Sequence, residues 1–131
     1  MTESAARGRR ILKEISILGA TTTIYVAESR DQVVARTAIL ETMVPDLRDL
    51  GVRRLILDSR QGQDHRDRSA IYRTVGASPE PEFAYDHQPS ADEPLLWVPD
   101  AVAWAWGRGG DWKRQVEELG LVTRVKAVDV S

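Results

Sequence analysis

Segments with the hydrophobic spacing of helices alternate along this sequence with short segments rich in β-branched residues. Helices are predicted over residues 9–18, 31–51, 64–75, 93–106 and 111–119. Strands are predicted over residues 21–28, 52–58, 82–87 and 121–130. Alternation of this kind predicts an α/β domain whose sheet is at least partly parallel. The length of 131 residues fits a single domain over residues 1–131, and the polar residues 1–8 are expected to be disordered.

Composition argues against several classes of protein. Without cysteine, the chain has no disulfides, no thiol nucleophile and no cysteine-based metal site. No apolar run approaches the ~20 residues of a membrane span, and no signal segment follows the N-terminus, so we expect a cytoplasmic protein without a membrane partner. The net charge is only −2, but 15 Arg stand against 3 Lys. This excess reflects either codon usage in a GC-rich genome or arginine clusters that contact phosphate.

Asp58 ends the most apolar of the predicted strands, over residues 52–58. In open α/β sheets, binding sites form beyond the carboxyl ends of strands, so an acid at this position favours a cation site or a catalytic role. The alternative is that Asp58 only caps the following turn through Ser59 and Arg60.

Two further acids lie on predicted helices. Apolar residues surround Asp100 in the sequence, so we expect its side chain to be buried and to need a cation, a metal or several donors. The alternative for Asp100 is a capping role beside Pro99 or a pair with an arginine. Glu41 borders the apolar stripe of the longest predicted helix, near a kink expected at Pro45. Alone, Glu41 is typical of a surface acid, but beside Asp58 and Asp100 it becomes the third member of a possible cation site.

Three carboxylates from separate elements are a ligand set that suits Mg²⁺ or Mn²⁺. We therefore predict that Glu41, Asp58 and Asp100 bind one of these ions and are catalytic. Two such ions about 4 Å apart activate a water and stabilise the leaving oxygen in phosphodiester cleavage. His87 is predicted to lie between a strand and a mobile loop, where it is a candidate for proton transfer. A solvated loop histidine would give the same pattern.

Basic and aromatic residues are candidates for contact with nucleic acid. The predicted contacts are Arg60, Arg66, Arg68, Arg108, Lys113 and Trp112. For the tryptophans, packing in a core or a dimer interface is the alternative. The mixed charges of residues 64–68, including His65, indicate a solvated helix face. The sequence contains no glycine-rich phosphate loop and no nucleophile elbow.

The order of elements and two short segments resemble the ribonuclease H-like superfamily. RRLILDSR places an acid at the end of a central strand, and PLLWVPDAVAWAWG begins a terminal helix that carries another acid. Within that superfamily, PDAVAWA is similar to the last-helix motif of the DUF3800 group. The resemblance covers residues 21–119. It implies an α/β fold with a ribonuclease H-like mixed sheet flanked by helices, in which the N-terminal strands are reduced or missing.

The resemblance also implies a role for each matching residue. Asp58 matches the acid of the fourth strand, and Asp100 matches the acid of the last helix. Glu41 corresponds to the first-helix acid, and His87 to a loop histidine that precedes the final helix. The family also carries an aspartate in its first strand, where the similar string YVAES has Ala27.

Three functions remain open at this point. The first is a nuclease-related protein that hydrolyses phosphodiester bonds of RNA or DNA with a divalent metal. The second is a catalytically inactive ribonuclease H-like module for protein interaction or homodimerisation, which the missing aspartate and an exposed sheet edge favour. The third is an enzyme that acts on a small phosphate compound. Nucleic acid, a second copy of the chain or another protein are thus the expected partners.

Overall fold

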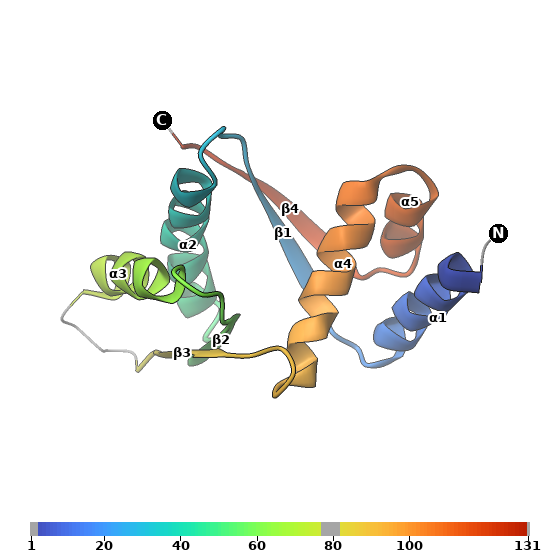
Figure 1. The fold of residues 1–131 in the computed structure, drawn as a ribbon, viewed down its shortest axis with the longest axis horizontal. Coiled ribbons are helices and arrows are strands. Elements are labelled where there is room, and N and C mark those ends of the chain that lie inside the picture. Colours follow the sequence, from blue (N-terminus) through green and yellow to red (C-terminus); the bar gives the residue numbers. More distant parts are fainter. Residues whose placement is uncertain (1–2, 77–81, 131) are drawn as a thin grey trace. The chain divides into compact units, whose positions relative to one another are not determined.

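The computed structural model of the chain describes residues 3–76 and 82–130, which form alternating helices and strands (Figure 1). In chain order these are α1 (Glu3–Ile17), β1 (Thr22–Ala27), α2 (Gln32–Asp49), β2 (Arg54–Asp58), α3 (Asp64–Val75), β3 (Ala84–Gln88), α4 (Trp97–Arg108), α5 (Gly110–Glu118) and β4 (Val122–Val128). A short 3₁₀ helix, Pro94–Leu96, precedes α4. The prediction of an α/β protein with parallel strands is confirmed.

Element bounds differ from the sequence predictions in a few places. Residues 3–8, which were expected to be disordered, belong to α1, where Gly8 lies against the ring of Trp112. The cap predicted at Asp111 lies two residues earlier, at Gly109, which has a φ of 75°. The turn predicted over 77–81 lies outside the described residues.

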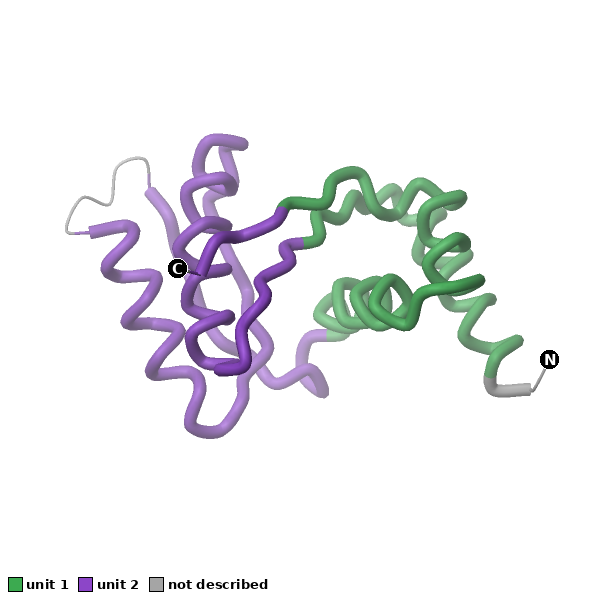
Figure 2. The backbone as a smooth tube through the Cα atoms, turned by 90° about the horizontal axis from the view of Figure 1, so that it is seen from above, with its two compact units in different colours: residues 1–24, 94–126 green, residues 25–93, 127–131 purple. Residues whose placement is uncertain are grey.

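The chain divides into two compact units, each built from two separate stretches of sequence (Figure 2). Unit 1 contains residues 1–24 and 94–126, and unit 2 contains residues 25–93 and 127–131. Strands β1 and β4 pair in a two-stranded sheet, and the boundary between the units falls within both strands. The single domain expected from the sequence stays a prediction.

Unit 2 contains a β–α–β arrangement in which α3 connects two parallel strands. Strands β2 and β3 pair in the register that sets Leu57 opposite His87 and Asp58 opposite Gln88. Helices α2 and α3 pack against each other. Between these elements lies an apolar core of Leu40, Val44, Leu57, Ala70, Ile71 and Phe83. The predicted N-cap of α2 is confirmed, since the Asp31 carboxylate accepts hydrogen bonds from two backbone amides of the first turn.

Unit 1 brings together α1, α4 and α5, which contact one another in pairs. Buried apolar side chains of these helices include Leu12, Ile15, Val102, Ala105 and Val116. Trp104 of α4 and Trp112 of α5 meet edge to face, with ring centroids 5.0 Å apart. The two rings therefore pack against each other, as the alternative of core packing expects, but Trp104 remains exposed.

Candidate metal centre

Three potential metal ligands meet at one edge of unit 2, where β2 and β3 end and α3 begins. Asp64 and Asp67 lie in the first turn of α3, and His87 is the penultimate residue of β3. The candidate ligand atoms of these residues lie within 4.8 Å of one another. Because β2 and β3 are parallel, their carboxyl ends share this edge, which is where open α/β sheets form binding sites. The group could hold a metal ion.

Asp67 is the buried charge at the centre of this group, and its side chain is 0% exposed. Arg36 of α2 donates from Nε to Oδ1 and from Nη2 to Oδ2, both at 2.8 Å. Gln63 Nε2 donates to Oδ1 at 3.0 Å, and His87 Nε2 lies 3.0 Å from Oδ2. Burial raises the pKa of this carboxyl, but hydrogen bonds from Arg36, His87 and Gln63 outweigh burial and bring the pKa to about 2. Asp67 is therefore ionised at neutral pH.

Asp64 closes the turn between β2 and α3. Its Oδ2 accepts a hydrogen bond of 2.6 Å from the Ser59 hydroxyl, and its Oδ1 accepts one of 2.8 Å from the backbone N–H of Arg60. These two bonds, the one from Ser59 first, lower the pKa of the Asp64 carboxyl. With 23% of its side chain exposed, Asp64 is the more accessible of the two carboxylates.

His87 occupies a different environment from the one expected. The sequence predicted a mobile loop histidine, but His87 lies within β3 and its side chain is 2% exposed. An ionised carboxylate only accepts hydrogen bonds, so Nε2 of His87 carries the proton in its bond to Asp67. The other nitrogen, Nδ1, is buried and has no hydrogen-bond partner in the described part of the chain. The strand position explains the difference, because it directs the imidazole toward the buried acid of α3.

Arg36 gives this group a positive charge of its own. Hydrogen bonding to Asp67 raises the pKa of the guanidinium, and the carboxylates of Asp58 and Asp64 also attract it. The group therefore has two possible roles. It can bind a divalent cation through two carboxylates and an imidazole, or it can serve as a buried ionic network that joins α2, α3 and β3.

Two of the predicted metal ligands lie in unit 2 but outside this group. Asp58 ends β2, where its carboxylate lies 3.9 Å from the Arg60 guanidinium and is 42% exposed. Glu41 of α2 forms an exposed ion pair of 3.3 Å with Arg73. Of the predicted catalytic residues, only His87 is part of the Asp64–Asp67–His87 group.

Asp100 belongs to unit 1 and is exposed, so the expectation that its side chain is buried was wrong. Helix α4 buries only the side that carries Val102 and Ala105. Asp100 instead borders an apolar pocket of about 480 Å³. The lining residues are Ile11, Ile15, Pro94, Trp97, Val98, Asp100, Ala101 and Trp104.

The predicted nucleic-acid contacts are distributed over both units. Arg60, Arg66 and Arg68 are exposed around the start of α3, and Arg68 acts electrostatically on Asp64. In unit 1, the Lys113 ammonium lies 4.7 Å from the ring centre of Trp106. Trp112, predicted as a stacking surface, is half-buried, with the Arg9 guanidinium 4.9 Å from its ring centre. Arg108, at the end of α4, is exposed.

Sequence reasoning missed Asp64, Asp67 and Arg36. The prediction of a solvated helix face is wrong for Asp67, which is buried together with Ala70 and Ile71. Helical spacing carried a usable signal, because positions four residues apart share a face and Asp67 precedes Ile71 by four. An acid in phase with the apolar stripe of a helix predicts a buried charge that needs a partner.

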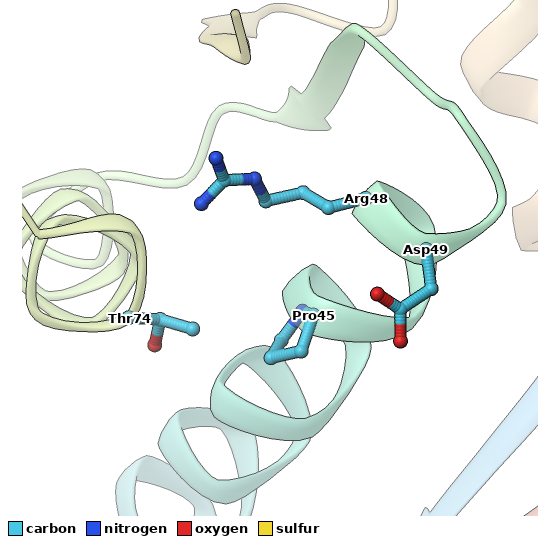
Figure 3. A pocket seen from close by; sticks show the side chains of 4 residues that line it. All are labelled: Pro45, Arg48, Asp49 and Thr74. Carbon is cyan, nitrogen blue, oxygen red and sulfur yellow. The ribbon is translucent and has the colours of Figure 1, made fainter. Parts of the chain in front are cut away.

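Another pocket, of about 260 Å³, lies in unit 2 toward the C-terminal ends of α2 and α3. Pro45, Arg48, Asp49 and Thr74 line it (Figure 3). The Arg48 side chain extends from α2 toward the α3 side of this pocket, as Figure 3 shows. The pocket contains none of the candidate metal ligands.

Comparison of the chain with family models, with curated proteins and with solved structures finds no match. In the described residues, the helices are all too short or too polar to span a membrane.

Proposed function

We propose that this chain is a nuclease-related protein that hydrolyses phosphodiester bonds of RNA or DNA with a divalent cation. The observation that carries the proposal is the Asp64–Asp67–His87 group at the carboxyl edge of two parallel strands. The ribonuclease H-like resemblance of residues 21–119 supports it further, because that superfamily places carboxylates at the end of a central strand. In this proposal Asp58 lies beside the cation site, and the family fold itself is part of what is proposed.

The ligand atoms suit one of the two expected ions better than the other. Two carboxylates and one imidazole form a mixed oxygen and nitrogen set, which Mn²⁺ accepts more readily than Mg²⁺ does. A bound ion would lower the pKa of a water and stabilise the leaving oxygen.

The chain's own residues would supply the remaining functions. Arg60, Arg66 and Arg68 are exposed near the start of α3, and their planar guanidinium groups suit contacts to phosphate oxygens. Ser59 and the backbone of Arg60 hold the Asp64 carboxylate in place. We infer that His87 would act as a ligand through Nε2, which lies 3.0 Å from Asp67 and would first release to solvent the proton that it donates to this carboxylate.

Thermal unfolding with Mn²⁺, together with cleavage of single-stranded and double-stranded oligonucleotides, tests the proposal. At a Mn²⁺ concentration of 100 times the Kd, binding stabilises the folded chain by about 2.7 kcal/mol, which raises the Tm by roughly 10 °C. Asp64→Asn should abolish both the shift and the cleavage. Glu41→Gln is the matched control, because its exposed pair with Arg73 lies outside the group. Cleavage that persists in Asp64→Asn, or a wild type without a Mn²⁺ shift, would contradict the proposal.

The second candidate function is a catalytically inactive ribonuclease H-like module that pairs with a protein or with a second copy. Exposed apolar residues of unit 1 favour it, namely Leu95, Trp97 and Trp104. In this case the buried ionic network around Asp67 is structural. Analytical ultracentrifugation would then show a dimer or a hetero-complex, and Mn²⁺ would neither stabilise the chain nor support cleavage.

A further inference from the structure

We propose that Arg36 competes with the divalent cation for Asp67, so that the ion binds only as the guanidinium leaves this carboxylate. The inference rests on the proposed function, because it concerns the regulation of the same cation site. It assigns to Arg36 the role of an internal cation that neutralises Asp67 until a divalent ion replaces it.

Asp67 already accepts as many hydrogen bonds as its two oxygens allow. Each carboxylate oxygen has two lone-pair positions. Oδ1 accepts from Arg36 Nε and Gln63 Nε2, and Oδ2 accepts from Arg36 Nη2 and His87 Nε2. All four positions are therefore used, and a metal ion can reach an Asp67 oxygen only after a donor leaves.

Arg36 is the donor that a divalent cation would drive away from Asp67. A divalent cation repels the guanidinium, which lies 2.8 Å from both oxygens, whereas the neutral amide of Gln63 has no such repulsion. His87 becomes a ligand only when Nε2 gives up its proton to solvent, which vacates one position on Oδ2, and an ion at that position would share the oxygen with Arg36 Nη2 and repel it. The Arg36 side chain is 31% exposed, so it can move into solvent without moving α2. Asp58, whose side chain is also partly exposed, already attracts Arg36 and gives it an alternative partner.

Mn²⁺ binding to the full chain, measured by electron paramagnetic resonance of the free ion, provides the test. Arg36→Gln should bind Mn²⁺ at least about tenfold more tightly than wild type. Arg73→Gln is the matched control, because it also removes a positive charge from unit 2, whereas Arg73 pairs with Glu41 outside the group. Loss of a positive charge from unit 2 alone would affect both variants equally, and we expect the control to stay within about threefold of wild type. Equal or weaker binding by a folded Arg36→Gln would overturn the competition.

A second measurement on wild type does not depend on the stability of that variant. The ¹⁵N–¹H signal of Arg36 Nε, assigned by its loss in Arg36→Lys, is followed while Mg²⁺ is added as a diamagnetic ion. Competition predicts that this signal shifts and loses protection from solvent exchange as the ion binds. An unchanged signal at saturation would contradict the competition but leave the cation site intact. If neither wild type nor an Arg36 variant binds an ion, the site itself is refuted, and the competition with it.

Discussion

Replacement of Asp67 by asparagine should destabilise the chain by about 3 kcal/mol. The side chain is 0% exposed, and Arg36 holds it through two hydrogen bonds. Removing one partner of a buried ion pair costs about 3–5 kcal/mol, because the remaining charge is left uncompensated. Arg36 keeps 31% of its side chain in solvent, which favours the lower end of that range.

The pKa of Asp67 gives a second route to this magnitude. A pKa of about 2, against an ordinary value of 3.8, corresponds to about 2 kcal/mol of interaction that depends on the charge. Asparagine also places an amide N–H₂ where a carboxylate oxygen accepted two hydrogen bonds, so Arg36 and either His87 or Gln63 each have a donor that loses its acceptor. A buried donor without a partner adds about 1 kcal/mol or more. The two routes agree on a loss of about 3 kcal/mol.

Urea unfolding followed by far-ultraviolet circular dichroism measures this loss. The tryptophans cannot report on it directly, because all of them lie in unit 1, at positions 97, 104, 106 and 112. Glu41→Gln serves as the control, since its exposed pair with Arg73 should contribute under about 1 kcal/mol. A loss in Asp67→Asn no larger than in the control, with an unchanged urea dependence, would refute the reasoning that this network is a buried one.

Three further predictions concern pH, core packing and helix packing. The folded state lowers the pKa of Asp67, so its contribution is complete above about pH 4 and is lost as the pH falls toward 2. The difference in unfolding free energy between wild type and Asp67→Asn should therefore shrink by about 2 kcal/mol between pH 5 and pH 2. Ile71 is 0% exposed, so Ile71→Ala should cost about 3 kcal/mol in urea unfolding, and a loss below about 1 kcal/mol would contradict its place in the core. A Cβ on Gly8 would lie 2.9 Å from the Trp112 ring, whereas one on Gly107 would meet nothing within 4 Å. Tryptophan-detected unfolding should thus show Gly107→Ala to be more stable than Gly8→Ala by about 1 kcal/mol or more.

Local structure was predictable wherever neighbouring residues determine it. The helix predicted over 64–75 has these bounds in the structure, and it ends at Gly76, which takes a φ of 69°. Asp31 caps α2 through hydrogen bonds to residues two and three positions later, a range that spacing alone can identify. Asp111 failed as a cap because Gly109 and Gly110 adopt positive φ and start α5 earlier. Glycine flexibility at this junction overrode the capping preference of aspartate.

The candidate site was harder to predict, because the partners that define it are far apart in the sequence. Position at a strand end favoured Asp58, and apolar neighbours favoured Asp100. Asp58 is nevertheless only half-buried, and Asp100 is exposed. Asp67 lies in a stretch of mixed charge, where the exposed Arg66 and Arg68 directly flank the buried acid. What buries Asp67 is the packing of α2 against α3, which brings Arg36 to it from 31 residues away. No spacing rule for a single helix contains that contact.

The helical face on which an acid lies predicts its burial better than its position at the end of a strand does. An acid that shares a helical face with core residues is buried in any fold that uses that face, whereas an acid at a strand end is buried only if another element covers it. Asp67 meets the first condition through Ile71, its neighbour four residues later. A buried acid also requires a cation, and in this chain arginine is much more frequent than lysine. The guanidinium can bind both carboxylate oxygens at once, so Arg36 satisfies Asp67 in a way that a lysine would not. A divalent ion that binds Asp67 must displace this guanidinium. The stability of unit 2 and the cation affinity of its proposed site are therefore linked.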